Sequence, residues 1–240
     1  MERKPKIGLV TIAYNEERFI KPFLSHIPKW VDETLVLVSQ VPWQGKSEMP
    51  DKTDLIADEM GATVIISDWT SEQDQRNAGQ DYFYDFDWII ILDPDEYLDN
   101  KGWKKLKDFI NDANFNAYTC DTQSTYWKSG YVIKPKEEYK QIILVQPSVR
   151  FIDKRVVNSS YATVPLNLHH FSWARTDNEC LSKISHYAHA HELNKDWYHN
   201  IWKKWTPEME NLHPMSPEAL KKAIPVKLPK ELEDLGLWPC

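Results

Sequence analysis

The chain has 240 residues and a formal net charge of −7, with 42% hydrophobic and 27% charged residues. This composition is typical of a globular protein, and the acidic balance disfavours broad nonspecific binding to nucleic acid. No apolar run approaches the roughly 18 residues of a membrane span, and no signal-peptide core follows the charged N-terminal residues, so we expect a cytoplasmic protein.

The first hundred residues alternate strand and helix patterns. Strands are expected at 6–12, 34–38, 63–66 and 88–92, with helices beginning near Asn15, Lys52 and Ser71. Repeated β-α-β units predict an α/β fold in which a mostly parallel sheet carries helices on both faces. Residues 1–100 should therefore form one βαβ half of the chain.

The pattern becomes irregular after a helix expected at 101–113. Short strands are expected near 117–120, 131–133, 142–145 and 149–152, followed by a helix at 179–193. We therefore expect residues 101–206 to form a smaller α+β region of the same domain. The prolines beyond residue 206 predict that 207–240 is a tail on the surface.

The fourth strand is followed at once by Asp93, Pro94 and Asp95. Its uninterrupted apolar run is typical of a strand buried on both faces, and Pro94 should end it and expose the carboxylates. Open α/β sheets bind ligands at this end of their strands, and two carboxylates suit Mg²⁺ or Mn²⁺ with a phosphorylated ligand. A polar turn that caps a core strand is the simpler explanation of this short motif.

Four segments, in order, resemble the family-2 glycosyltransferases of the GT-A fold. They are Thr11-Ile-Ala-Tyr-Asn-Glu-Glu17, Gln75-Arg-Asn-Ala-Gly79, Asp93-Pro-Asp95-Glu96 and His169-His-Phe-Ser-Trp173. Their order and spacing match over roughly the first 100 residues, and the match to the second half is thinner. The resemblance implies a GT-A-like fold in which 1–100 binds a nucleotide-diphospho-sugar and 101–206 binds the acceptor.

The resemblance also implies which residues contact the sugar donor. They are Ala13, Tyr14, Asn15, Glu16, Arg76 and Asp93. Arg76 has an equally good alternative as a helix-surface residue paired with Glu72. Such families usually carry an acidic residue after the second strand, where this chain has Ser39 and Gln40. We expect Ser39 or Gln40 to replace it as a neutral hydrogen-bonding group. A UDP-sugar is the usual donor.

A divalent metal, Mn²⁺ or Mg²⁺, is implied at Asp93 and Asp95. A neutral imidazole from His169 or His170 can complete the metal shell, and His170 better matches the usual pattern. Glu96 could hold a metal-bound water as an outer ligand. Arg175 or Lys183 is expected to neutralise the departing diphosphate, although each could be an ordinary surface charge.

These assignments predict a metal-dependent glycosyltransferase that transfers the sugar to an acceptor hydroxyl with inversion at the anomeric carbon. The general base is chosen among Asp121, Asp177 and Glu179, and the last two are favoured slightly because they follow the His170 segment. Trp127 and Trp173 are candidates for stacking on an acceptor sugar, although core packing is the commoner role of tryptophan.

The acceptor is expected to be a carbohydrate or another hydroxyl compound, and a hydroxylated base in DNA is a less favoured choice because the chain is acidic. Two alternatives remain. A nucleotidyltransferase would normally have a glycine-rich loop after the first strand, where residues 13–17 contain no glycine. A noncatalytic sugar or nucleic-acid binding protein would have little need of the paired aspartates.

Overall fold

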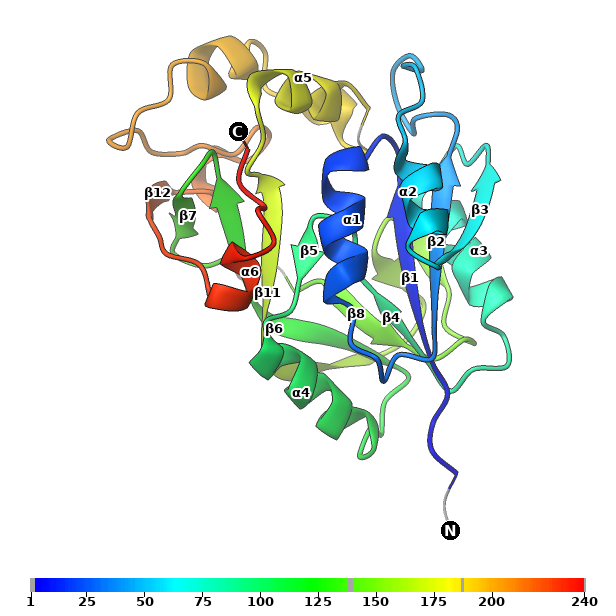
Figure 1. Cartoon of the computed structure of the whole chain (residues 1–240). Coiled ribbons are helices and arrows are strands. Elements are labelled where there is room, and N and C mark those ends of the chain that lie inside the picture. Colours follow the sequence, from blue (N-terminus) through cyan, green and yellow to red (C-terminus); the bar gives the residue numbers. More distant parts are fainter. Residues whose placement is uncertain (1–2, 138–139, 187, 240) are drawn as a thin grey trace.

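The computed structural model describes residues 3–137, 140–186 and 188–239 (Figure 1). Four parallel strands occupy one side of its main sheet in the order β3-β2-β1-β4. These strands are β1 (Ile7–Ala13), β2 (Glu33–Ser39), β3 (Thr63–Ser67) and β4 (Trp88–Ile91), and the helices between them are α1 (Glu17–His26), α2 (Thr53–Glu59) and α3 (Glu72–Tyr82). The predicted α/β fold with a parallel central sheet is confirmed.

The second half of the chain extends this sheet with mainly antiparallel strands. β8 (Ile142–Val145) pairs with β4, and β6 (Ala117–Trp127), β7 (Tyr131–Lys134) and β12 (Lys222–Pro225) follow in that order. The long strand β11 (Tyr161–Trp173) runs parallel to β6 and also pairs with β5 (Glu96–Tyr97). The sheet is therefore mixed, and the antiparallel pairing of β8 with β4 joins its two halves.

The remaining elements are short or lie on the outside of the sheet. They are α4 (Asn100–Ile110), the hairpin β9 (Phe151–Asp153) and β10 (Val156–Val157), α5 (Asp177–His186), α6 (Lys230–Glu233), the 3₁₀ turns Ala190–Glu192 and Pro217–Ala219, and the π-turn Tyr198–Trp202. No helix within the described ranges is long and apolar enough to cross a membrane.

The uninterrupted apolar run of β4 is explained by two hydrophobic clusters, one on each face of the sheet. Trp88 and Ile90 join the cluster that includes residues of α1, α2 and α4, whereas Ile89 and Ile91 join the cluster beneath the end of α3. Successive side chains of a strand point to opposite faces, so a strand covered on both sides must be apolar at every position.

A third cluster is rich in tryptophan and packs the second half of the chain. It contains Trp127, Trp173, Trp197 and Trp202. Trp127 has no exposed surface, so it cannot offer its ring to an acceptor sugar as the sequence suggested. The side chain is instead covered by the other indole rings of the cluster.

Residues 207–240 differ from the surface tail that their prolines suggested. They contribute β12 to the sheet, and Leu212, Leu220, Leu232 and Leu237 are buried. Pro225 ends β12 at the edge of the sheet, where its missing N–H costs no ladder bond. The prolines therefore mark the ends of short elements within a packed segment.

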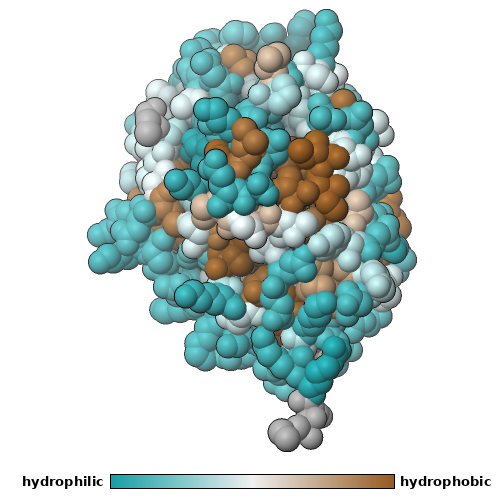
Figure 2. Space-filling view, turned by 45° about the vertical axis from the view of Figure 1, so that its right-hand side comes forward, coloured by the Kyte–Doolittle hydropathy of each residue, from teal (hydrophilic) through white to brown (hydrophobic). Residues whose placement is uncertain are grey.

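The molecular surface is mainly hydrophilic on the face drawn in Figure 2, with separate hydrophobic patches. Large apolar side chains that are exposed are scattered along the sequence, among them Met49, Leu55 and Ile66. Single exposed apolar residues of this kind are normal on a globular protein.

The close packing of α3 on β1 gives a test of the fold. A Cβ atom added at Gly79 would lie 2.7 Å from both Cγ atoms of Val10. We expect Gly79→Ala to lower the free energy of unfolding by about 1–2 kcal/mol, because overpacking outweighs the gain in helix propensity. Urea unfolding measures the change. Gly79→Ala should cost less when it is added to Val10→Ala than when it is added to the unchanged chain. Equal stability of Gly79→Ala and the unchanged chain would contradict this packing.

Candidate functional site

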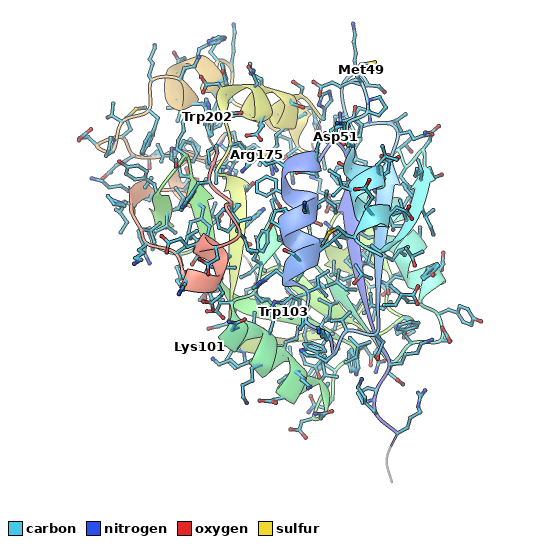
Figure 3. The ribbon with its side chains drawn as sticks, viewed as in Figure 1. Met49, Asp51, Lys101, Trp103, Arg175 and Trp202 are labelled. Carbon is cyan, nitrogen blue, oxygen red and sulfur yellow. The ribbon has the colours of Figure 1, made fainter. Side chains whose placement is uncertain are left out.

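A cavity of about 990 Å³ lies at the carboxyl ends of β1 and β4. Its walls come from the β1–α1 turn, the segment after β4, the end of β11 and α5. Figure 3 shows Arg175 and Asp51 on either side of the first turn of α1, at the opposite end of the sheet from Lys101 and Trp103. This is the end at which open α/β sheets place their ligands.

The β1–α1 turn is fastened to the loop before α2. Asn15 has a φ of 53°, a left-handed conformation that asparagine tolerates better than most residues. Its Oδ1 accepts a hydrogen bond from the Asp51 amide at 3.1 Å, and its Nδ2 donates to the Met49 carbonyl at 3.2 Å. The hydroxyl of Tyr14 accepts from the Glu48 amide at 2.8 Å. The two side chains thereby shape one rim of the cavity.

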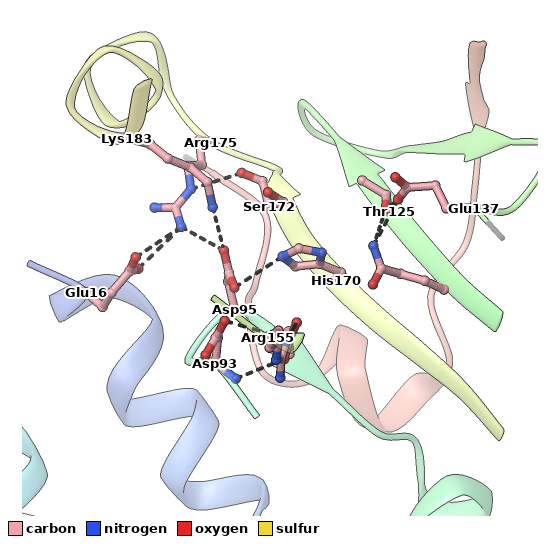
Figure 4. Close-up of polar contacts among 12 residues, drawn as sticks. Glu16, Asp93, Asp95, Thr125, Glu137, Arg155, His170, Ser172, Arg175 and Lys183 are labelled. Atoms are coloured by element: carbon pink, nitrogen blue, oxygen red, sulfur yellow. Dashed lines mark hydrogen bonds and ion pairs between the residues drawn. The ribbon is translucent and has the colours of Figure 1, made fainter. Parts of the chain in front are cut away.

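Asp95 is the centre of a buried ionic cluster (Figure 4). Its Oδ2 accepts hydrogen bonds from Arg175 Nη2 at 2.9 Å and from Lys183 Nζ at 3.0 Å, and its Oδ1 lies 3.5 Å from His170 Nε2. Burial raises the pKa of Asp95, but the charges of Lys183 and His170 outweigh it and hold the pKa well below its usual range. Asp95 is therefore an anion surrounded by three cationic or protonatable groups.

Glu16, the residue before α1, belongs to the same cluster. Its carboxylate lies 3.3 Å from Arg175 Nη2. Burial raises the pKa of Glu16, and Arg175 opposes that shift. Arg175 thus connects the first turn of the chain to Asp95. Burial lowers the pKa of its guanidinium, but the charges of Glu16 and Asp95 outweigh this effect and raise the pKa.

Asp93 belongs to a second ionic cluster. Its carboxylate lies 3.0 Å from Arg76 Nη2 and 3.7 Å from Arg155 Nη1. Arg76 also binds Glu72 at 2.9 Å, as its alternative interpretation expected, but the side chain is buried and does not lie on the helix surface. Arg155 forms a paired contact with Glu96, whose Oε2 in addition accepts from the Asp93 amide at 2.9 Å. Glu96 therefore fixes the turn that carries the two aspartates.

The structure distinguishes the two neighbouring histidines. His170 faces Asp95 and lines the cavity, whereas His169 points to the other side of β11 and its Nδ1 lies 2.7 Å from the Tyr126 hydroxyl. Successive residues of a strand alternate in direction, which explains the difference. Of the two histidines, His170 is the one positioned to act with Asp95.

The predicted metal ligands fit a divalent ion in part. Asp95 Oδ1 and His170 Nε2 form a close oxygen–nitrogen pair, but Asp93 points to Arg76 and Arg155 instead. Within the described part of the chain, no three His, Cys, Asp or Glu side chains are arranged to hold a metal. The described side chains that could bind a divalent ion together are therefore Asp95 and His170.

Most of the predicted site residues surround this one cavity. Those lining it are Tyr14, Asn15, Glu16, Asp93, Asp95, His170, Trp173, Arg175, Glu179 and Lys183. Those not among its lining residues are Ala13, Ser39, Gln40, Arg76, Asp121, Trp127 and Asp177. Ser39 is buried, and its hydroxyl donates a hydrogen bond to the Val41 carbonyl of its own loop at 2.6 Å.

The three candidate bases lie in different surroundings. Asp121 is exposed on β6, away from the cavity. Asp177 accepts hydrogen bonds from Lys203 and Trp202, and the bond from Lys203 lowers its pKa to about 2. Glu179 lines the cavity, but it is 2.5 Å from Arg18 Nε and accepts from the Thr176 amide at 2.7 Å.

Several lining residues were not found from the sequence. They are Gln123, Thr125, Glu137, Lys154, Arg155 and His213. None belongs to a recognisable motif, and they come from β6, the segment after β7, the β9–β10 hairpin and the C-terminal segment, which only the complete fold brings together. The motif that follows β4 therefore gives no indication of these cavity residues.

Comparison with known proteins supports the resemblance found in the motifs. No protein-family profile matches the chain. It is 30% identical over 113 residues to an uncharacterized glycosyltransferase of Rickettsia bellii, which is 47% of this chain and 35% of that protein. It is 31% identical over 105 residues to an uncharacterized glycosyltransferase of Rickettsia felis, covering 44% and 32%.

A TPR repeat-containing protein of Synechococcus elongatus is 25% identical over 146 residues, which is 61% of this chain and 33% of that protein. The chain spans about a third of the length of these curated relatives. Among solved structures, S. aureus TarS is similar with a TM-score of 0.46 and 14% identity, covering 69% of this chain and 36% of TarS. Over nearly half of its length the chain is therefore similar to glycosyltransferases, which agrees with the resemblance of its motifs.

Proposed function

We propose that this chain is a metal-dependent glycosyltransferase that moves a sugar from a nucleotide-diphospho-sugar to an acceptor hydroxyl. One observation carries the proposal: the β1–α1 turn, the Asp93–Asp95 turn and the His170 strand, separated by about 80 residues each, line a single cavity. In this proposal residues 1–100 bind the donor, with uridine as the usual base, and 101–206 bind the acceptor.

Arg175 and Lys183 are the groups that would bind the diphosphate. Both point to Asp95 Oδ2 from the same side of the cavity, one before α5 and one within it. Phosphate oxygens are good acceptors for guanidinium and ammonium donors, and the two positive charges would stabilise the negative charge that grows on the leaving diphosphate.

Asp95 and His170 would hold a divalent cation as two of its ligands. The imidazole nitrogen beside a carboxylate suits Mn²⁺ better than Mg²⁺. When bound, the ion would add to the neutralisation of the leaving diphosphate.

The acceptor hydroxyl would attack the anomeric carbon from the face opposite the diphosphate. A carbon–oxygen bond to the acceptor forms, the carbon–oxygen bond to the diphosphate breaks, and its electron pair leaves with the diphosphate. This displacement inverts the anomeric centre, and a carboxylate must take the proton of the hydroxyl.

Nucleotide binding tests the donor site. We expect the melting temperature to rise with one of UDP, GDP, CDP or dTDP. Lys183→Ala should weaken that binding about tenfold, equivalent to about 1.4 kcal/mol, because one phosphate-binding charge is lost. Lys104→Ala is the matched control, since Lys104 is an exposed lysine that pairs with Asp108 on α4. If none of the four nucleotides shifts the melting temperature, the proposal is wrong.

Metal removal tests the second part of the proposal. Hydrolysis of the nucleotide-sugar that carries the bound nucleotide should fall at least tenfold in EDTA and return with Mn²⁺, because Asp95 and His170 then regain their ion. Asp95→Ala should abolish hydrolysis in either condition, while Asp108→Asn should leave it unchanged. A rate that is insensitive to EDTA would show that Arg175 and Lys183 act without a metal.

A further inference from the structure

We propose that Glu137 is the carboxylate that takes the proton of the acceptor hydroxyl. This assignment rests on the glycosyl transfer proposed above and adds a residue that the motifs did not reveal. Glu137 follows β7 and forms an isolated antiparallel bridge with Gln123 of β6. It lines the same cavity as Asp95 and His170.

The position of Glu137 is fixed by the strand next to His170. Thr125 of β6 is the register partner of His170 on β11. The Thr125 hydroxyl donates a hydrogen bond to Glu137 Oε2, and Gln123 Nε2 donates to the same oxygen at 3.0 Å. In Figure 4, His170 lies between Asp95 and the Thr125–Glu137 pair. Glu137 therefore faces the cavity from the side opposite the proposed diphosphate site.

Charge separates Glu137 from Asp95 and Glu179, two other carboxylates of the cavity. Asp95 is paired with Arg175 and Lys183, and Glu179 is paired with Arg18. A carboxylate in such a pair is a poor proton acceptor, because the cation stabilises its charged form. Glu137 is held by neutral donors through Oε2, and no described residue donates a hydrogen bond to its Oε1.

Among the described residues, no basic side chain donates a hydrogen bond to Glu137 Oε1. Lys136 Nζ donates to Asn167 Oδ1 at 2.7 Å and so points to β11 instead. His213 also lines the cavity, and burial lowers its pKa while the charge of Glu137 opposes that shift. His213 is therefore a basic group close to Glu137, and burial favours its neutral form.

The proton transfer then follows from the geometry. The acceptor O–H donates to Glu137 Oε1, and its proton moves to that oxygen as the new carbon–oxygen bond forms. The bond from the anomeric carbon to the diphosphate breaks on the other side, and the diphosphate carries the electron pair away. Thr125 and Gln123 act as positioning residues, because they bind Oε2 and leave Oε1 to accept from the acceptor hydroxyl.

Water serves as the acceptor probe, since hydrolysis of the nucleotide-sugar requires the same proton transfer. We expect Glu137→Gln, which keeps the shape of the side chain, to lower kcat for hydrolysis 10²- to 10⁴-fold. KM and the affinity for the nucleoside diphosphate should stay within about twofold, because Glu137 does not contact the diphosphate site. The residual rate should rise in proportion to hydroxide concentration, which a structural defect would not produce.

Two further variants serve as controls for the assignment of Glu137. Glu137→Asp keeps the carboxylate on a shorter side chain and should retain a kcat between those of Glu137→Gln and the unchanged protein. Asp108→Asn, which neutralises an exposed carboxylate of α4, should have no effect. If Glu137→Gln unfolds, Glu137→Asp alone decides, and an unreduced kcat in that variant counts against Glu137.

The two proposals fail in different ways. If the unchanged protein binds a nucleoside diphosphate and hydrolyses its sugar, but Glu137→Gln keeps kcat within threefold, Glu137 is not the base and the glycosyltransferase stands. If Glu137→Gln loses nucleotide affinity together with kcat, the role of Glu137 is in binding, and the assignment is overturned. Absence of binding and hydrolysis in the unchanged protein would instead reject the proposed function.

Discussion

Three acidic side chains are buried or half-buried within four residues of one another at the end of β4, and the structure around them is organised by the need to pair their charges. Asp93, Asp95 and Glu96 cannot leave water at low cost unless cations accompany them. The partners come from distant parts of the chain: Arg76 from α3, Arg155 from the β9–β10 turn, and Arg175 and Lys183 from the segment around α5. The ion pairs therefore bind the two halves of the chain to the same turn.

In the proposed function these ion pairs would also prepare the cavity for an anionic ligand. Arg175 and Lys183 are already directed at Asp95, so a diphosphate that enters would find both donors held in place and would compete with the carboxylate for them. Donors that are oriented before binding lose less conformational freedom when the ligand arrives. The same buried charges that require pairing during folding thus provide a preorganised site afterwards.

The sequence predicted what depends on local pattern and missed what depends on long-range pairing. The strand at 88–91 could be predicted because burial on both faces leaves an uninterrupted apolar run, and Pro94 located the turn behind it. The expectation that this turn exposes its carboxylates was wrong, because cations from distant segments cover Asp95 and Glu96. Arg155 and Glu137 could not be predicted, because a lone charged residue in a turn carries no sign of the distant strand that it will face.

Trp127 was predicted to contact the acceptor, but it lies in the core. An indole ring has the same chemistry in a core as under a sugar, and only the complete fold shows that this one is covered. Residues 207–240 were misjudged for a related reason, since their prolines indicate interruptions but not the buried leucines between them. Site residues were best predicted where a motif follows directly on a recognisable strand.

The tryptophan cluster has a mechanical consequence for the cavity. Trp173 forms part of its wall and is backed by Trp127, Trp197 and Trp202, so this side is as stiff as a close-packed interior. The rim at residues 45–52 is mostly exposed and is held by hydrogen bonds from Tyr14, Asn15 and α5. A bulky ligand would therefore be accommodated more readily by displacement of this exposed rim than by displacement of the close-packed indole rings.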